Sequence, residues 1–71
     1  MKIPKYIENA LNKRQKAAYD WNDADFVISR FIHENGLEDE IDTADFNGGV
    51  EAIVNPAESN ERIRQAIINK K

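Results

Sequence analysis

Apolar and small residues recur three and four positions apart over the first half of the chain, between Pro4 and Asn35. This spacing places them on one face of an α-helix. Pro4 suits the first turn of a helix, where its missing N–H group costs nothing. Gly36 follows directly and suits a helix end, because glycine readily takes the left-handed conformation there. The pattern therefore predicts one long helix over 4–35. Asp20, Asn22, Asp23 and Asp25 are poor helix formers, so a kink or break near Asp20 is the alternative.

The apolar face of this predicted helix is narrow up to Trp21 and broad from Phe26 to Ile32. A helix over 4–35 would be about 48 Å long, whereas a compact chain of 71 residues is only about 30 Å across. We therefore expect its N-terminal part to extend from the body and to meet one helical neighbour through the narrow face. The residues of this predicted contact face are Ile3, Ile7, Leu11, Arg14, Ala18 and Trp21.

Arg14 interrupts that face with a charge. A buried charge is costly unless it is paired, so Arg14 could pair with an acid on a neighbouring helix and fix the register. Alternatively, its long aliphatic stem lies along the face while the guanidinium reaches water. The sequence leaves both interpretations open.

The second half of the chain shows a different pattern. Residues 41–46 alternate weakly, because Asp42 and Asp45 lower their strand propensity, whereas 50–54 is a good strand run. Asn47-Gly48 lies between the two runs, and this dipeptide is a strong signal for a β-hairpin turn. Asn55, Pro56 and Glu58 then have the form of a helix N-terminus. We therefore predict a hairpin over 41–54 and a helix over 56–69. The expected core residues are Phe26, Ile28, Phe31, Ile32, Leu37, Val50, Ala52, Val54, Ile63 and Ile67.

These elements predict a single α+β domain over 1–71, in the order α-β-β-α. A domain of this size buries only about 60% of the surface that its unfolded chain exposes, so self-association is an expected stabiliser. The chain has no cysteine, which excludes disulfides and fits a reducing compartment. No apolar run reaches the length of a membrane span or forms a signal peptide. We expect a cytoplasmic protein with no membrane partner.

The net charge is −3, but the charges are unevenly distributed. Residues 1–19 carry +4, residues 20–61 carry −11, and residues 62–71 carry +4. Opposite charges could attract within the fold or between subunits. The acids could instead form a face that mimics nucleic acid, whose members would be Asp20, Asp23, Asp39, Asp42 and Asp45. Lys13-Arg14-Gln15-Lys16 could contact a nucleic-acid backbone, although the central acidic residues oppose it, so nucleic acid is not the expected partner.

No pattern of chemically active residues indicates an enzyme. Asp25, Ser29 and His33 share a helix face at four-residue spacing, but nothing presents the serine on a strained turn or supplies an oxyanion hole. One histidine without cysteine is too few ligands for a zinc site. The acids of 38–45 lack the spacing of a calcium loop, and Gly48-Gly49 lacks that of a phosphate loop. We expect no catalytic residue, metal, cofactor or small-molecule ligand.

Five short segments are considered together: 2–7 (KIPKYI), 35–36 (NG), 48–51 (GGVE), 54–56 (VNP) and 61–67 (ERIRQAI). As a set they resemble small proteins encoded by phages and prophages of Gram-positive bacteria. The resemblance implies an accessory protein of a mobile element, located in the host cytoplasm, with no assigned activity and no catalytic residue to transfer.

The sequence therefore predicts a non-enzymatic protein–protein interaction module that forms a homo-oligomer through the helix over 4–35. The alternatives are an acidic inhibitor that mimics nucleic acid, and a weak nucleic-acid binder that uses the basic N-terminal helix. The layout of surface charge separates these alternatives, since mimicry needs a continuous acidic face and binding needs a continuous basic one.

Overall fold

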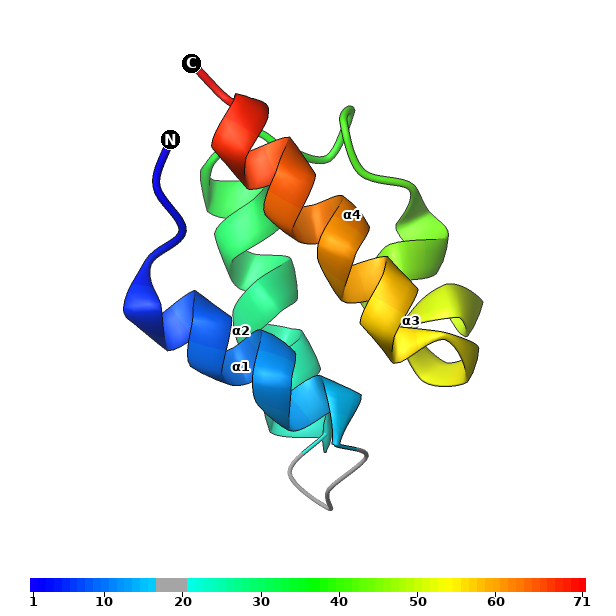
Figure 1. The fold of residues 1–71 in the computed structure, drawn as a ribbon. Helices are drawn as coiled ribbons and strands as arrows, with labels where there is room; N and C mark the ends of the chain where they lie inside the picture. The colour runs from blue at the N-terminus through cyan, green and yellow to red at the C-terminus, as the bar shows by residue number, and fades with distance from the viewer. Residues whose placement is uncertain (17–20) are drawn as a thin grey trace.

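The structure is a computed structural model that describes residues 1–16 and 21–71. These residues form four α-helices and one short 3-10 helix, and they contain no β-strand. The elements are α1 (Lys5–Gln15), α2 (Trp21–Glu34), η1 (Thr43–Asp45), α3 (Val50–Val54) and α4 (Pro56–Asn69). Helix α1 packs against α2 and α4, and α4 also contacts η1 and α3 (Figure 1). The predicted α+β class is therefore wrong, because the fold is all-α.

The single helix predicted over 4–35 is also wrong. The alternative, a kink or break near Asp20, falls at a position outside the residues that the structure describes. Helix α1 ends at Gln15, α2 begins at Trp21, and the two helices pack against each other. This arrangement buries Ile7 and Leu11 of α1 completely in the core that also contains Ile28 of α2. Burying one such side chain contributes about 1.5–3 kcal/mol, and an extended rod would leave the face of α1 in water. The longest extent of the molecule is accordingly only 33 Å.

The predicted end of the helix at Gly36 is confirmed. Gly36 has a φ of +64°, which is the left-handed conformation that glycine adopts at low cost. The amide of Leu37 donates to the carbonyl of Ile32 at 2.9 Å, and the amide of Gly36 donates to that of His33 at 3.2 Å. Together these bonds form a Schellman motif. The buried side chain of Leu37 joins the same core.

The hairpin predicted over 41–54 does not form. Asn47 and Gly48 do adopt positive φ values of 55° and 73°, but their turn links η1 to α3 rather than two strands. The amide of Asn47 donates to the hydroxyl of Ser29 at 2.8 Å, and that of Gly48 to the carboxylate of Asp25 at 2.7 Å. Both acceptors lie on α2. Hydrogen bonds to this helix, rather than pairing with a second strand, therefore hold the turn.

Gly49 completes the connection between the turn and α3. A Cβ atom at this position would collide with the backbone of Ala44, so only glycine permits η1 and α3 to approach this closely. Helix α3 has one turn and a half and buries only Ala52 completely. Its remaining apolar side chains therefore stay outside the core.

Helix α4 has the bounds predicted for the last helix, with Pro56 in its first turn. The side chain of Asn55 makes no capping hydrogen bond, so that detail of the prediction is wrong. Three residues predicted for the core, Phe26, Val50 and Val54, are exposed. Within the described ranges, none of the helices has the length and apolar character that crossing a membrane requires.

Candidate functional site

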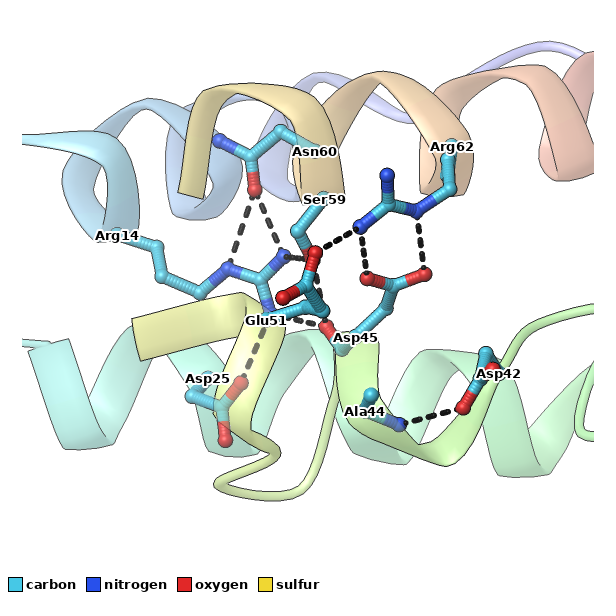
Figure 2. A network of polar contacts seen from close by, with 9 residues as sticks. All are labelled: Arg14, Asp25, Asp42, Ala44, Asp45, Glu51, Ser59, Asn60 and Arg62. Carbon is cyan, nitrogen blue, oxygen red and sulfur yellow. Dashed lines mark hydrogen bonds and ion pairs between the residues drawn. The ribbon is translucent and has the colours of Figure 1, made fainter. Parts of the chain in front are cut away.

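Arg14, which lies on α1, is completely buried and hydrogen-bonds to four other residues. Its guanidinium makes five hydrogen bonds, which matches its five N–H groups. Nε and Nη2 donate to Oδ1 of Asn60 at 3.1 and 2.8 Å, and Nη2 also donates to Oγ of Ser59 at 3.1 Å. Nη1 donates to Oδ1 of Asp25 at 2.9 Å and to the carbonyl of Asp45 at 2.7 Å. Figure 2 shows these five residues, which we call the Arg14 cluster.

The cluster joins four elements, because its members come from α1, α2, η1 and α4. The acceptors are themselves held in position. Asp25 binds the amide of Gly48 with its second oxygen, and Asn60 donates from Nδ2 to the carbonyl of Leu11 at 2.7 Å. In the part of the chain that the structure describes, no buried side-chain nitrogen or oxygen lacks a partner. Such a fully satisfied network specifies one arrangement of the helices.

An ion pair between Asp45 and Arg62 borders the cluster. The Asp45 carboxylate is buried, and it accepts two hydrogen bonds from Arg62, at 2.9 Å from Nε and 2.7 Å from Nη2 (Figure 2). The bonds from Arg62 hold the pKa of Asp45 below its ordinary value. The same pair raises the pKa of Arg62. Because the bonds are bidentate and charge-assisted, they fix η1 firmly on α4.

The Arg14 cluster has a structural role, which is to hold the helices together. Burial lowers the pKa of Arg14, and the hydrogen bond with Asp25 opposes that effect. Every guanidinium donor is already used, so none remains for an incoming anion. Asp25, Ser29 and His33 do not form the chain of hydrogen bonds that a triad requires: Asp25 binds Arg14, Ser29 binds the amide of Asn47, and Nδ1 of His33 lies 2.8 Å from Glu38. Among the described residues, no group of metal-ligating side chains could hold an ion.

The structure places three of the five described residues of the predicted contact face in the interior. Ile7, Leu11 and Arg14 are completely buried within the chain, whereas Ile3 and Trp21 are half-buried. Ala18 lies outside the described residues. The neighbouring helix that the narrow face requires is thus supplied by α2 and α4 of the same chain. Of the two interpretations of Arg14, the buried pair with an acid of a neighbouring helix is the observed one.

Of the predicted acidic residues that the structure describes, Asp45 is not on the surface. Asp45 is buried and paired, and Asp42 caps η1 by accepting the amide of Ala44 at 2.9 Å. Asp23 lies in the first turn of α2, and about 16 Å of helix separates it from the end of α2, after which Asp39 follows in the loop. Asp20 lies outside the described residues.

An exposed apolar surface on α3 was not predicted. Val50, Ile53 and Val54 are 63%, 60% and 64% exposed, and their spacing places them on one face of the helix. Ile53 also borders a hollow that Trp21 and Pro56 line. We call Val50, Ile53, Val54, Trp21 and Pro56 the α3 patch. The sequence showed the run of large aliphatic residues, but its strand-like composition assigned two of them to the core.

Comparisons with known proteins give no relative for this chain: no family model, no curated protein and no solved structure matches it. The resemblance to short phage and prophage proteins therefore remains a prediction.

Proposed function

We propose that this protein is a non-enzymatic protein–protein interaction module that self-associates through the α3 patch. The observation that supports the proposal is the exposure of Val50, Ile53 and Val54 together on one short helix. Single exposed apolar residues are ordinary on a protein surface, whereas a contiguous group of them marks a contact site. A chain of 71 residues also gains stability when it buries such a group against a second copy.

This proposal moves the contact surface from α1 to α3. Ile68, 51% exposed, is a single exposed large apolar side chain on α4. Tyr6 and Phe26, 57% and 66% exposed, border one hollow but form a smaller group than the three residues of α3. Because the same patch would meet itself across a two-fold axis, the simplest assembly is a symmetric dimer. We also propose that the protein acts in the cytoplasm, in line with its lack of cysteine, and that it is a phage or prophage accessory protein.

The test is the concentration dependence of the molar mass in solution at high salt, measured by light scattering and sedimentation velocity. We expect the mass of the wild-type chain to rise from monomer toward dimer, and Ile53→Gln/Val54→Gln to remain monomeric. Glutamine keeps the helix propensity, so the variant should fold. Ile68→Gln is the matched control, since it removes an exposed isoleucine outside the patch. A wild-type chain that stays monomeric at millimolar concentration contradicts the proposal.

A further inference from the structure

The arginines and the lysines of this chain have different roles. Within residues 1–16 and 21–71, the ion pairs use all four arginines: Arg14, Arg30, Arg62 and Arg64. No lysine takes part in any of these pairs. Lys5, Lys13 and Lys16 are exposed along α1 and its C-terminal end. The ion pairs within the described fold therefore leave this positive charge unmatched.

The outer side of α1 forms a basic ridge. Lys5, Asn9, Asn12 and Lys16 are exposed and lie opposite the buried face of the helix, as their three- and four-residue spacing requires. The ridge is about 16 Å long. The one acid of α1, Glu8, turns to α4, where it accepts a hydrogen bond from Arg64 at 2.6 Å. The solvent face of α1 therefore carries lysine and asparagine and no carboxylate of its own, while Asp23 of α2 borders the hollow beside Asn9 and Lys13.

A groove with acidic edges lies elsewhere on the molecule. It has a volume of about 600 Å³ and runs between α4 and the segment that leads into η1, with Ile41 and Ala66 among its lining residues. Glu40, Asp42 and Glu61 also line it, and Asp39 is exposed in the same loop. Two charged pairs lie in or beside the groove: Arg62 binds Asp45, and Glu61 accepts from Arg64 at 3.0 Å. Lys70 donates to the carbonyl of Gly36 at 3.4 Å and keeps its charge, so Glu40 and Asp42 supply the acidic character of the edge. Figure 1 shows α1 at the lower left and the loop before η1 at the upper right.

We infer that the groove takes the α1 ridge of a second copy of this chain. One surface is convex and basic and the other is concave and acidic, and the same sequence encodes both. Because two different surfaces meet, the contact is head-to-tail and adds copies one after another unless the ring closes. Attraction between exposed charges is weak and screened by salt. The contact is therefore a low-affinity one that forms at low ionic strength, and it does not use the α3 patch.

Charge reversal tests the contact in the full chain. Lys5→Glu/Lys16→Glu reverses the ridge, and Asp39→Lys/Glu40→Lys reverses the edge of the groove. We expect the wild-type mass to be higher at about 0.01 M salt, where the Debye length is about 30 Å, than at about 1 M, where it is about 3 Å. Each variant alone should have the same molar mass at low and at high salt. An equimolar mixture of the two variants should restore the increase at low salt, because each ridge then meets a groove of opposite charge.

The control variants separate this contact from a general effect of net charge and from a loss of folding. Asp23→Lys/Glu58→Lys changes the net charge as much as the groove variant but lies outside the groove. Because Asp23 borders the hollow beside Asn9 and Lys13, this variant should associate at least as strongly as the wild type. Lys5→Gln/Lys16→Gln should also lose the increase, and it keeps the test valid if the Glu variant does not fold. A wild-type mass that is equal at both salts overturns the inference, as does a mixture no heavier than its components. Binding of an added DNA or RNA oligonucleotide by the ridge, without self-association, also overturns it.

The variants distinguish a failure of this inference from a failure of the proposed function. Ile53→Gln/Val54→Gln removes the association that persists at high salt and should leave the salt-sensitive one. Reversal of the charges on the ridge or the groove should remove the salt-sensitive association and leave the one that persists at high salt.

Discussion

Nη1 of Arg14 lies 2.9 Å from Oδ1 of Asp25, and both side chains are buried between helices that follow each other in the chain. Removing one partner of a buried pair leaves the other charge without compensation. Asp25 also accepts the amide of Gly48, so the pair connects the packing of α1 on α2 to the turn before α3. The charge that interrupts the predicted contact face is thus the residue around which the helices assemble.

The first prediction concerns the removal of this charge. Arg14→Met should lower the free energy of unfolding by about 3–5 kcal/mol, because Asp25, Asn60 and the carbonyl of Asp45 all lose a donor. Urea unfolding followed by circular dichroism measures the change. Arg30→Met is the matched control: the Arg30–Glu34 pair is exposed, so its loss should cost less than about 1 kcal/mol. Equal losses in the two variants would contradict the role of Arg14.

The second prediction concerns pH. The pKa of Asp45 lies below its ordinary value of 3.8 because Arg62 binds the carboxylate. A group with a lowered folded-state pKa contributes stability above its unfolded pKa, and that contribution disappears as the pH falls through the folded pKa. Asp45→Asn should therefore destabilise the chain by about 1–3 kcal/mol at neutral pH.

The penalty of Asp45→Asn should shrink as the pH falls below 3.8. Urea unfolding of both proteins from neutral to acidic pH tests this expectation. A penalty that is constant over the whole range would show that the ionised carboxylate is not the source of the stability.

The third prediction compares two neighbouring glycines. Gly48 has a positive φ, but a Cβ there would meet nothing within 4 Å, so Gly48→Ala should cost only the left-handed strain, about 1–2 kcal/mol. A Cβ on Gly49 would collide with the backbone of Ala44. Gly49→Ala should therefore cost more than Gly48→Ala, as measured by thermal unfolding. The reverse order would mean that η1 and α3 are not in close contact.

The fourth prediction separates the observed core from the one that the sequence suggested. Phe26 is 66% exposed, whereas Ile28 is completely buried. Ile28→Ala should cost about 2–5 kcal/mol, and Phe26→Ala less than about 1 kcal/mol. Denaturant unfolding of the two variants measures both values. A large loss of stability from Phe26→Ala would show that this side chain is buried in the core.

Local signals in the sequence predicted the local features. Gly36 ends α2 as expected, the turn at Asn47 and Gly48 has the expected dihedral angles, and α4 has the expected bounds. These features depend on the conformational preferences of a few adjacent residues. The sequence therefore contains enough information to place helix ends and turns.

Contacts between distant residues decided the features that the sequence missed. The apolar periodicity continues across the segment between α1 and α2, so it could not show that α1 folds back to bury Ile7 and Leu11. Val50 and Val54 have strand propensity, but Ser29 and Asp25 hold the preceding turn on α2. Only the alternative of a buried, paired Arg14 pointed toward the observed cluster. The exposure of the α3 patch depends on the whole fold, and no local pattern reports it.

The most direct test of this fold is nuclear magnetic resonance of the Arg14 guanidinium in the full chain. The structure predicts a slowly exchanging Nε proton with cross-relaxation to the side chain of Asn60, which lies 46 residues away in the sequence. It also predicts helical chemical shifts over Val50–Val54. Rapid exchange of the Arg14 protons with water, with no contact to Asn60, would show that α1 does not fold back onto α2 and α4.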